Sequence, residues 1–162
     1  MGSSSSLPSL SHLKVYMFKH ILLATDGSVA SLHAAKLAVG MAREHGAQLT
    51  ALYVSDPYPY IGMGEINPMG YQAYSSAAQQ IAAEAHAQVE ALCQAESPAI
   101  HLQVRLVEDV AAASGIVDSA KELACDLIVL GSHGRSGIAR LMLGSVATKV
   151  VAESSVPVLV TR

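Results

Sequence analysis

Tryptophan is absent from this chain of 162 residues, and aromatic and charged residues are scarce, at 4% and 14%. The net charge is -3 and no run of lysine and arginine occurs, so the basic surface that nucleic-acid binding requires is missing. No apolar stretch approaches the roughly 20 residues that a membrane-spanning helix needs. We therefore expect a cytoplasmic protein that binds neither nucleic acid nor a membrane.

Metal and redox motifs are also missing. The two cysteines, Cys93 and Cys125, lie far apart in the chain and match no metal-binding or redox spacing. Each sits in an apolar pattern of helical period, which predicts a buried and reduced thiol. The seven histidines form no H-E-x-x-H or similar cluster, so we expect no histidine metal site.

The N-terminal residues 1–16 differ in composition from the rest. They are rich in serine and lack the long apolar core of a secretion signal. We interpret them as a disordered leader or tag-like extension, with Met17 as the native start. The length of residues 17–162 predicts a single domain.

Short apolar runs alternate with longer helical patterns along residues 17–162. Strands are predicted at residues 19–25, 48–54, 100–107, 126–130 and 156–161, and helices at residues 31–44, 71–96, 110–124 and 146–154. This alternation predicts a three-layer α/β/α sandwich with a five-stranded parallel sheet. The order of the strands does not follow from the sequence alone.

Two segments carry more specific expectations. In the first helix, the apolar stripe of Leu32, Ala35, Leu37, Ala38 and Met41 is expected to face the core. Residues 56–70 hold three prolines and three glycines, so they are predicted to form no regular element.

Glycines gather between the strand at 126–130 and the helix at 146–154. Residues 131–145 read G-S-H-G-R-S-G-I-A-R-L-M-L-G-S. Glycine lets the backbone approach a ligand closely, and the unpaired N–H groups of a helix's first turn attract an anion. Ser145, at the predicted N-cap, adds a hydroxyl. The segment therefore has the character of a phosphate-binding loop.

Two common phosphate loops are excluded. A Walker A loop needs a Gly-Lys pair, which occurs nowhere, and the dinucleotide fingerprint G-x-G-x-x-G is absent. The spacing present is Gly131, two residues, Gly134, nine residues, then Gly144 and Ser145. This G-2x-G-9x-G-[ST] pattern resembles the nucleotide-binding motif of the universal stress protein family, in its ATP-binding branch.

The resemblance extends beyond the loop. Residues 21–28 (I-L-L-A-T-D-G-S) are similar to the family's first strand and turn, and residues 156–162 (V-P-V-L-V-T-R) to its closing strand. It implies an adenine nucleotide alpha hydrolase-like fold with strand order 3-2-1-4-5. In that order Asp26 and Gly131 would face each other at the switch point where ligands bind. It also implies a homodimer that pairs the edge strand from Val156 to Thr161 with its twin.

The resemblance further implies which residues bind a nucleotide. Asp26 would lie near adenine and ribose, although its sequence context also makes it a candidate cap for the following helix. Arg135 and Arg140 would contact phosphate or lie solvated on the surface, and His133 is expected to be exposed. The expected nucleotide-binding residues are Ala24, Thr25, Asp26, Val54, Leu130, Gly131, Gly134, Arg135, Gly144, Ser145 and Val146.

The resulting expectation is an ATP-binding protein that senses or stores adenine nucleotide in stress survival. ADP, AMP or a cyclic nucleotide are alternative ligands, and Mg²⁺ or Mn²⁺ would enter with the phosphates. Because no base or carboxylate pair marks the loop, we expect no efficient enzyme, while weak ATP hydrolysis or nucleotidyl transfer stays open. A nucleotide-free interaction module with a partner surface at residues 58–74 is the further alternative.

Overall fold

A computed structural model describes residues 17–59, 67–135 and 142–162. Their five strands form one parallel sheet in the order β3-β2-β1-β4-β5, which confirms the order that the resemblance implied. The elements along the chain are β1 (His20–Ala24), α1 (Val29–His45), β2 (Gln48–Val54), α2 (Pro68–Gln94), β3 (Leu102–Val107), α3 (Ala112–Glu122), β4 (Leu127–Gly131), α4 (Ser145–Glu153) and β5 (Val158–Thr161).

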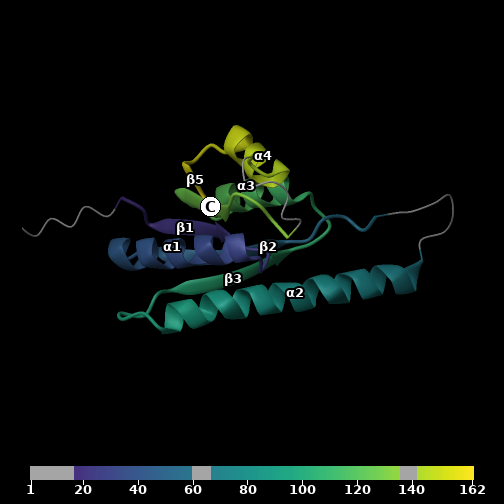
Figure 1. Ribbon diagram of the computed structural model, residues 1–162, viewed down its shortest axis with the longest axis horizontal. Coiled ribbons are helices and arrows are strands. Elements are labelled where there is room, and N and C mark those ends of the chain that lie inside the picture. The colour runs from purple at the N-terminus through teal and green to yellow at the C-terminus, as the bar shows by residue number, and fades with distance from the viewer. Residues whose placement is uncertain (1–16, 60–66, 136–141) are drawn as a thin grey trace, which may run out of the picture.

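Helices cover both faces of the sheet, which confirms the three-layer expectation. Helices α1 and α2 pack against one face, and α3 and α4 pack against the other (Figure 1). The central strands β1 and β4 are therefore enclosed on both sides, and Ile21, Leu22 and Ile128 are completely buried. This burial explains why these strands are continuous apolar runs rather than alternating patterns.

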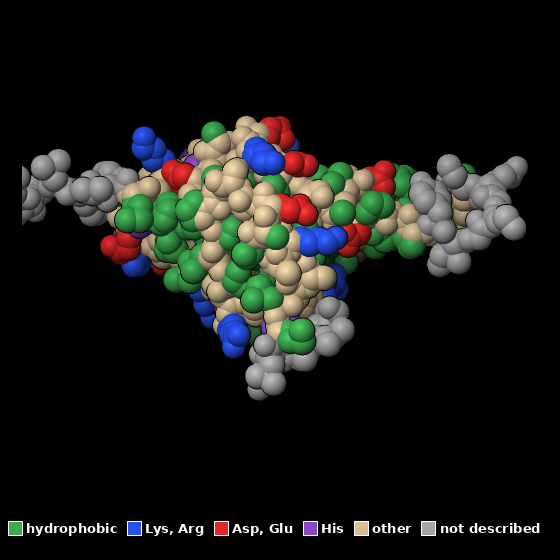
Figure 2. Space-filling model, turned by 90° about the horizontal axis from the view of Figure 1, so that it is seen from above, with side chains coloured by type: hydrophobic (Ala, Val, Ile, Leu, Met, Phe, Trp, Pro, Cys, Tyr) green, Lys and Arg blue, Asp and Glu red, His purple; other side chains and the backbone are tan. Residues whose placement is uncertain are grey.

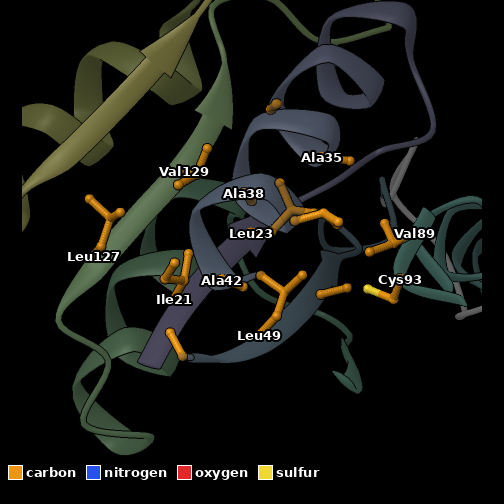
Figure 3. Packing of buried hydrophobic residues seen from close by; sticks show 14 residues of the cluster. Ile21, Leu23, Ala35, Ala38, Ala42, Leu49, Val89, Cys93, Leu127 and Val129 are labelled. Atoms are coloured by element: carbon orange, nitrogen blue, oxygen red, sulfur yellow. The ribbon is translucent and has the colours of Figure 1, made fainter. Parts of the chain in front are cut away.

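The larger part of the core lies between the sheet and the α1–α2 layer. Ile21, Leu23, Leu49 and Val129 point from the strands toward small residues of α1 (Figure 3). Small side chains let a helix lie close to the sheet, and each large aliphatic residue buried there stabilises the fold by about 1.5–3 kcal/mol. Cys93 is buried in this region and unpaired, as predicted.

The predicted stripe of α1 is confirmed in part. Ala35 and Ala38 are buried and Met41 packs against the core, whereas Leu37 is 43% exposed and Ala34 and Ala42 are buried instead. The helix is so rich in alanine that its sequence contains no strong apolar stripe. The face with the smallest side chains allows the closest packing, and it leaves Leu37 outside.

Helix α2 begins earlier than expected. Asn67 caps it by accepting hydrogen bonds from the N–H groups of Met69 and Gly70, and Pro68 occupies the first turn. Proline is well suited there because the first N–H groups of a helix need no intrahelical partner. The expectation of irregular structure is thus wrong for residues 68–70. The predicted leader at residues 1–16, the central part of the 56–70 segment and Arg140 lie outside the described residues.

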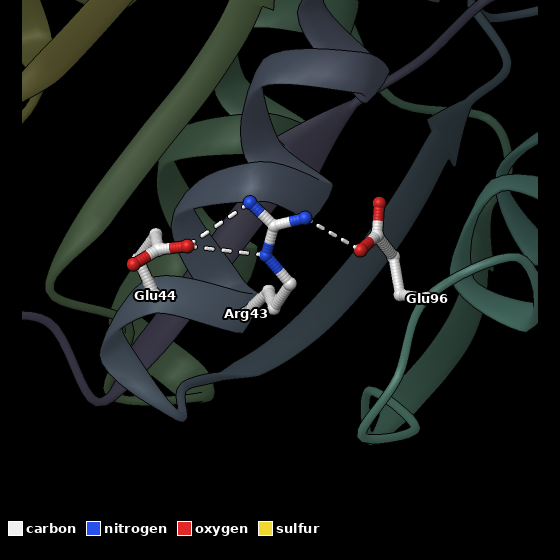
Figure 4. Close-up of polar contacts among 3 residues, drawn as sticks. All are labelled: Arg43, Glu44 and Glu96. Atoms are coloured by element: carbon white, nitrogen blue, oxygen red, sulfur yellow. Dashed lines mark hydrogen bonds and ion pairs between the residues drawn. The ribbon is translucent and has the colours of Figure 1, made fainter.

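Surface charges of both signs are interspersed on the face shown in Figure 2. One cluster joins two helices: the Arg43 guanidinium on α1 donates to Glu44 and, at 2.8 Å, to Glu96 just beyond α2 (Figure 4). Such exposed ion pairs contribute little to stability. No helix among the described residues is long and apolar enough to cross a bilayer.

Candidate functional site

A cavity of about 180 Å³ opens at the carboxyl ends of β1, β2 and β4. From the neighbouring strands β1 and β4 the chain continues into helices on opposite faces, α1 after β1 and α4 after β4. Ligands of open α/β sheets bind at such a switch point. Ten of the eleven predicted residues line this cavity: Ala24, Thr25, Asp26, Val54, Leu130, Gly131, Gly134, Gly144, Ser145 and Val146.

One side of the cavity is apolar. Leu52 and Val54 of β2 and Ile116 of α3 line it. Helix α3 comes close because its Gly115 has no side chain: a Cβ there would lie 2.7 Å from Cγ1 of Val54. Leu52 and Ile116 were missed in the sequence, because their apolar patterns show burial but not which buried residues border a cavity.

Two side chains, Asp26 and Ser28, form the hydrogen bonds that hold the turn between β1 and α1. Ser28, rather than Asp26, caps α1, and its hydroxyl accepts a hydrogen bond from the Ser31 N–H at 3.2 Å. Asp26 accepts from the Ser28 N–H at 2.9 Å and from the Arg135 N–H at 3.0 Å. The predicted capping alternative for Asp26 is therefore wrong, because its carboxylate spans from its own turn to the glycine loop.

Thr25 lies deeper at the same end of β1. It is 6% exposed and lines the cavity, and its hydroxyl donates to the Ser31 hydroxyl at 3.3 Å. The expectation left open whether Thr25 borders the site or belongs to the core. In the structure it does both.

The three motif glycines meet different neighbours. A Cβ on Gly131 would lie 2.9 Å from the carbonyl carbon of Ala30, so this glycine lets β4 and α1 approach each other. A Cβ on Gly144 would lie 3.1 Å from the backbone carbonyl oxygen of Ser132, which accepts a hydrogen bond from the Gly144 N–H at 2.8 Å. A Cβ on Gly134 would lie 3.0 Å from Oδ2 of Asp26. The motif thus combines close packing with access to the cavity.

Helix α4 begins at the cavity. Its N-cap is Gly144, and no side chain caps the first turn. The prediction of Ser145 as N-cap is therefore wrong: Ser145 is the first helical residue and lines the cavity together with Val146. The first-turn N–H groups of a helix have no intrahelical acceptor, so this end of α4 suits an anion.

Ser132 and His133 add polar groups to the cavity wall. Ser132 is 4% exposed, and its hydroxyl lies 2.8 Å from Nδ1 of His133. His133 lines the cavity and is half-buried, which corrects the expectation of surface exposure. Ser132 was missed, because a serine in a glycine-rich loop carries no signal of its own.

Arg135 is not among the residues that line the cavity. Its positive charge acts on the phenol of Tyr53, the penultimate residue of β2. Burial raises the pKa of Tyr53, and the positive charge of Arg135 opposes that shift.

The described cavity lining contains one carboxylate, Asp26, and neither lysine nor arginine. No group of three or more His, Cys, Asp or Glu side chains in the described parts of the chain is arranged to hold a metal ion. A divalent ion in this site would therefore depend on ligands that arrive with the bound molecule, as phosphates do.

Comparison with known proteins identifies relatives of the whole domain. A universal stress protein of Methanocaldococcus jannaschii is 35% identical over 146 residues, which cover 90% of this chain and 83% of that protein. The structure of UspA from Lactobacillus plantarum superposes with a TM-score of 0.74 at 32% identity, covering 89% of this chain and 97% of the other.

A universal stress protein solved in complex with cAMP superposes with a TM-score of 0.63 at 28% identity, covering 90% and 97% of the two chains. The sequence profile of the universal stress protein family matches residues 17–162. The cavity at the β1–β4 switch point and the glycine motif thus occur in a chain that belongs to the universal stress protein family.

Proposed function

We propose that this protein binds an adenine nucleotide in the cavity and acts as a nucleotide-dependent sensor in stress survival. ATP is the expected ligand, with ADP and AMP as alternatives. The observation that carries the proposal is the convergence of Asp26, Gly131 and Ser145, from three separate segments, on one cavity at the switch point. The relative bound to cAMP supports the adenine-nucleotide class.

The two sides of the cavity suit the two ends of such a ligand. The apolar side at Val54 and Ile116 offers a slot for the adenine ring. The glycine loop and the first turn of α4 offer backbone N–H groups to the phosphates. Mg²⁺ or Mn²⁺ would be held by the phosphates, consistent with the scarcity of carboxylates in the lining.

The substitution Gly134→Val tests this orientation. The added side chain would press against the Asp26 carboxylate and displace the loop backbone that the bound phosphates must approach closely. We expect the wild-type protein to bind ATP with Mg²⁺ at a dissociation constant on the order of micromolar and the variant to bind at least about tenfold more weakly. Titration calorimetry measures both constants.

Gly40→Val serves as the matched control, because an added Cβ at Gly40 of α1 meets nothing within 4 Å. It should leave the affinity for ATP unchanged. Mass spectrometry of any nucleotide released from the denatured wild-type protein identifies the natural ligand. Equal ATP affinities of wild type and Gly134→Val would contradict the phosphate-binding role of the loop.

A slow hydrolase is the competing proposal, and the Ser132–His133 pair favours it. The contact of 2.8 Å between hydroxyl and imidazole gives the cavity one group able to accept a proton. Phosphate release from ATP that persists in His133→Ala would count against this role. We expect the rate to be low, because the part of the lining that the structure describes offers no carboxylate besides Asp26.

We also propose a cytoplasmic homodimer in which β5 pairs with its copy. All residues of β5 are half-buried, and the strand forms one edge of the sheet. An apolar edge strand with open backbone groups is a template for pairing unless it is covered. Pro157 immediately precedes β5, a position that proline tolerates at a sheet edge.

A further inference from the structure

Helix α3 forms one wall of the apolar slot that the proposed function assigns to the adenine ring. Ala112 in its first turn and Ile116 one turn later line the cavity together with Val54 of β2. The helix and the strand are in close contact, since a Cβ on Gly115 would lie 2.7 Å from Cγ1 of Val54. The width of the slot therefore depends on where the first turn of α3 lies relative to the end of β2.

The N-terminus of α3 is completed by a residue from another part of the chain. Its own N-cap residue is Ala111, which forms no side-chain hydrogen bond to the first turn. Oδ1 of Asp56 supplies an acceptor instead, and the Ala112 N–H donates to it at 3.0 Å. Because Asp56 closely follows β2, this hydrogen bond connects the end of β2 to the first turn of α3 across 56 residues of sequence.

The backbone around Asp56 is itself fixed by the sheet and by α2. The Ser55 N–H donates to the Val107 carbonyl at 2.8 Å, which continues the pairing of β2 with β3. The Tyr74 hydroxyl of α2 donates to the Asp56 carbonyl at 2.8 Å. Asp56 is exposed and is not among the described residues that line the cavity, so it does not border a ligand bound there.

We propose that Asp56 is a positioning residue for the adenine end of the nucleotide site and acts through the first turn of α3. The inference rests on the proposed function and adds to it a residue outside the cavity. Without the carboxylate, the leading N–H group of α3 loses its acceptor, so the first turn can shift or fray. Ala112 and Ile116 then no longer keep one geometry, and a bound adenine ring has to order them, which lowers its affinity.

The phosphate end of the site depends on other contacts. The Arg135 N–H donates to Asp26 at 3.0 Å, and the Gly144 N–H donates to the Ser132 carbonyl at 2.8 Å. These hydrogen bonds hold the glycine loop and the start of α4 without Asp56. The loss of Asp56 is therefore expected to affect ligands through their adenine ring and not through their phosphates.

Amide hydrogen exchange of the ligand-free protein, followed by NMR, tests the first step. The Ala112 N–H depends on Asp56 for protection, because a helix offers no acceptor to its first N–H groups. We expect this amide to exchange at least about fivefold faster in Asp56→Ala. In Asp56→Asn, whose side-chain oxygen still accepts, it should exchange at nearly the wild-type rate. Equal Ala112 exchange rates in wild type and Asp56→Ala would overturn the inference.

Titration calorimetry with adenosine, and with ATP and Mg²⁺, tests the consequence for binding. We expect Asp56→Ala to bind both ligands about three- to tenfold more weakly than the wild type, by the same factor because they share the adenine ring. Asp56→Asn should keep both affinities within about twofold of the wild-type values. Asp118→Ala, which removes an exposed carboxylate from the same helix, is the matched control and should change neither affinity.

A loss of ATP affinity without a loss for adenosine would place the effect at the phosphates and overturn the inference. Unchanged affinities in Asp56→Ala would overturn it as well, and so would an equally large loss in Asp56→Asn or in Asp118→Ala. Thermal melts show whether each variant is folded at the temperature of the titration, so that a loss of folding is not mistaken for a loss of affinity.

The wild-type titrations separate this inference from the proposed function. A wild-type protein that binds neither ligand contradicts the proposed function itself. A wild-type protein that binds ATP but not adenosine contradicts the adenine slot and, with it, the role of Asp56. A wild-type protein that binds both, with an Asp56→Ala variant of identical affinities, contradicts only the role of Asp56.

Discussion

The motif glycines of this protein meet different structural demands. Gly131 faces the backbone of Ala30 in α1, whereas Gly134 faces the Asp26 carboxylate beside the cavity. The glycine motif therefore includes a position, Gly131, that is needed for close packing of β4 against α1. We expect the loss of Gly131 to weaken the fold first, and the loss of Gly134 to weaken the proposed binding of phosphate first.

Cys125 provides a prediction at this scale. Burial raises the pKa of its thiol from 9.0 to about 11. Between these pH values the unfolded chain binds fewer protons than the native protein, so the free energy of unfolding falls as the pH rises. The decline from pH 9 to about 11 should be larger in the wild type than in Cys125→Ala by about 1–3 kcal/mol.

Urea denaturation at a series of pH values measures this difference. Other groups with raised pKa values, such as Cys93, are present in both proteins and cancel in the comparison. Parallel declines in wild type and variant would show that the native thiol of Cys125 ionises as readily as the unfolded one.

At the scale of elements, helix ends are completed by different means. The Ser28 hydroxyl caps α1 locally, and Gly144 starts α4 without any side-chain cap. Helix α3 receives a distant partner: the Asp56 carboxylate after β2 accepts the Ala112 N–H at 3.0 Å. Because Asp56 follows β2, this contact fixes the start of α3 beside the strand whose Val54 lines the cavity.

The approach of α3 to β2 yields the prediction for this scale. In Gly115→Ala the new methyl group would lie 2.7 Å from Cγ1 of Val54, so the valine or the helix must shift. We expect the free energy of unfolding to fall by about 1–3 kcal/mol. The affinities for adenosine and ATP should fall together, about threefold or more, because the adenine end is disturbed. Calorimetry and urea denaturation measure both effects.

Gly40→Ala is the control, because a methyl group there meets nothing within 4 Å and alanine favours the helix. A Gly115→Ala protein with unchanged stability and unchanged affinities would show that Val54 adapts without cost.

For the whole molecule, the sheet order decides which strands are available to a partner. β3 and β5 form the two edges, and β4 and β1 are enclosed between them. The proposed dimer uses the β5 edge. Its Thr161 carbonyl accepts the Ser132 N–H at 2.7 Å, so the proposed interface and the glycine loop are joined by a direct hydrogen bond.

A substitution at each edge tests the proposed dimer. Val160→Lys would place a charge on the β5 edge of each copy, and we expect the dissociation constant of the dimer to rise at least about tenfold. Val104→Lys makes the same change on the opposite edge, where Val104 is 56% exposed, and should leave the dimer intact. Sedimentation measures the mass of each protein. A monomeric wild type, or equal effects of both substitutions, contradicts the proposal.

The sequence by itself determined the elements and the class of fold. The apolar run of β4 and the alternation of helices and strands are local features of the chain. Their periodicity can therefore be recognised in the sequence alone. The strand order came from resemblance to a family, carried by Gly131, Gly134, Gly144 and Ser145. Most residues that line the cavity could be predicted in the same way.

Only the tertiary structure decided what distant segments do to one another. The hydrogen bond from the Arg135 N–H to the Asp26 carboxylate joins two loops that lie far apart in the chain, one after β1 and one after β4. The buried face of α1 was likewise set by its packing on the sheet, which excluded Leu37. Such features depend on which side chains come into contact after folding, so they cannot be predicted from local sequence patterns. The glycine motif thus marks where a nucleotide is expected, while the folded chain determines what holds the loop in place.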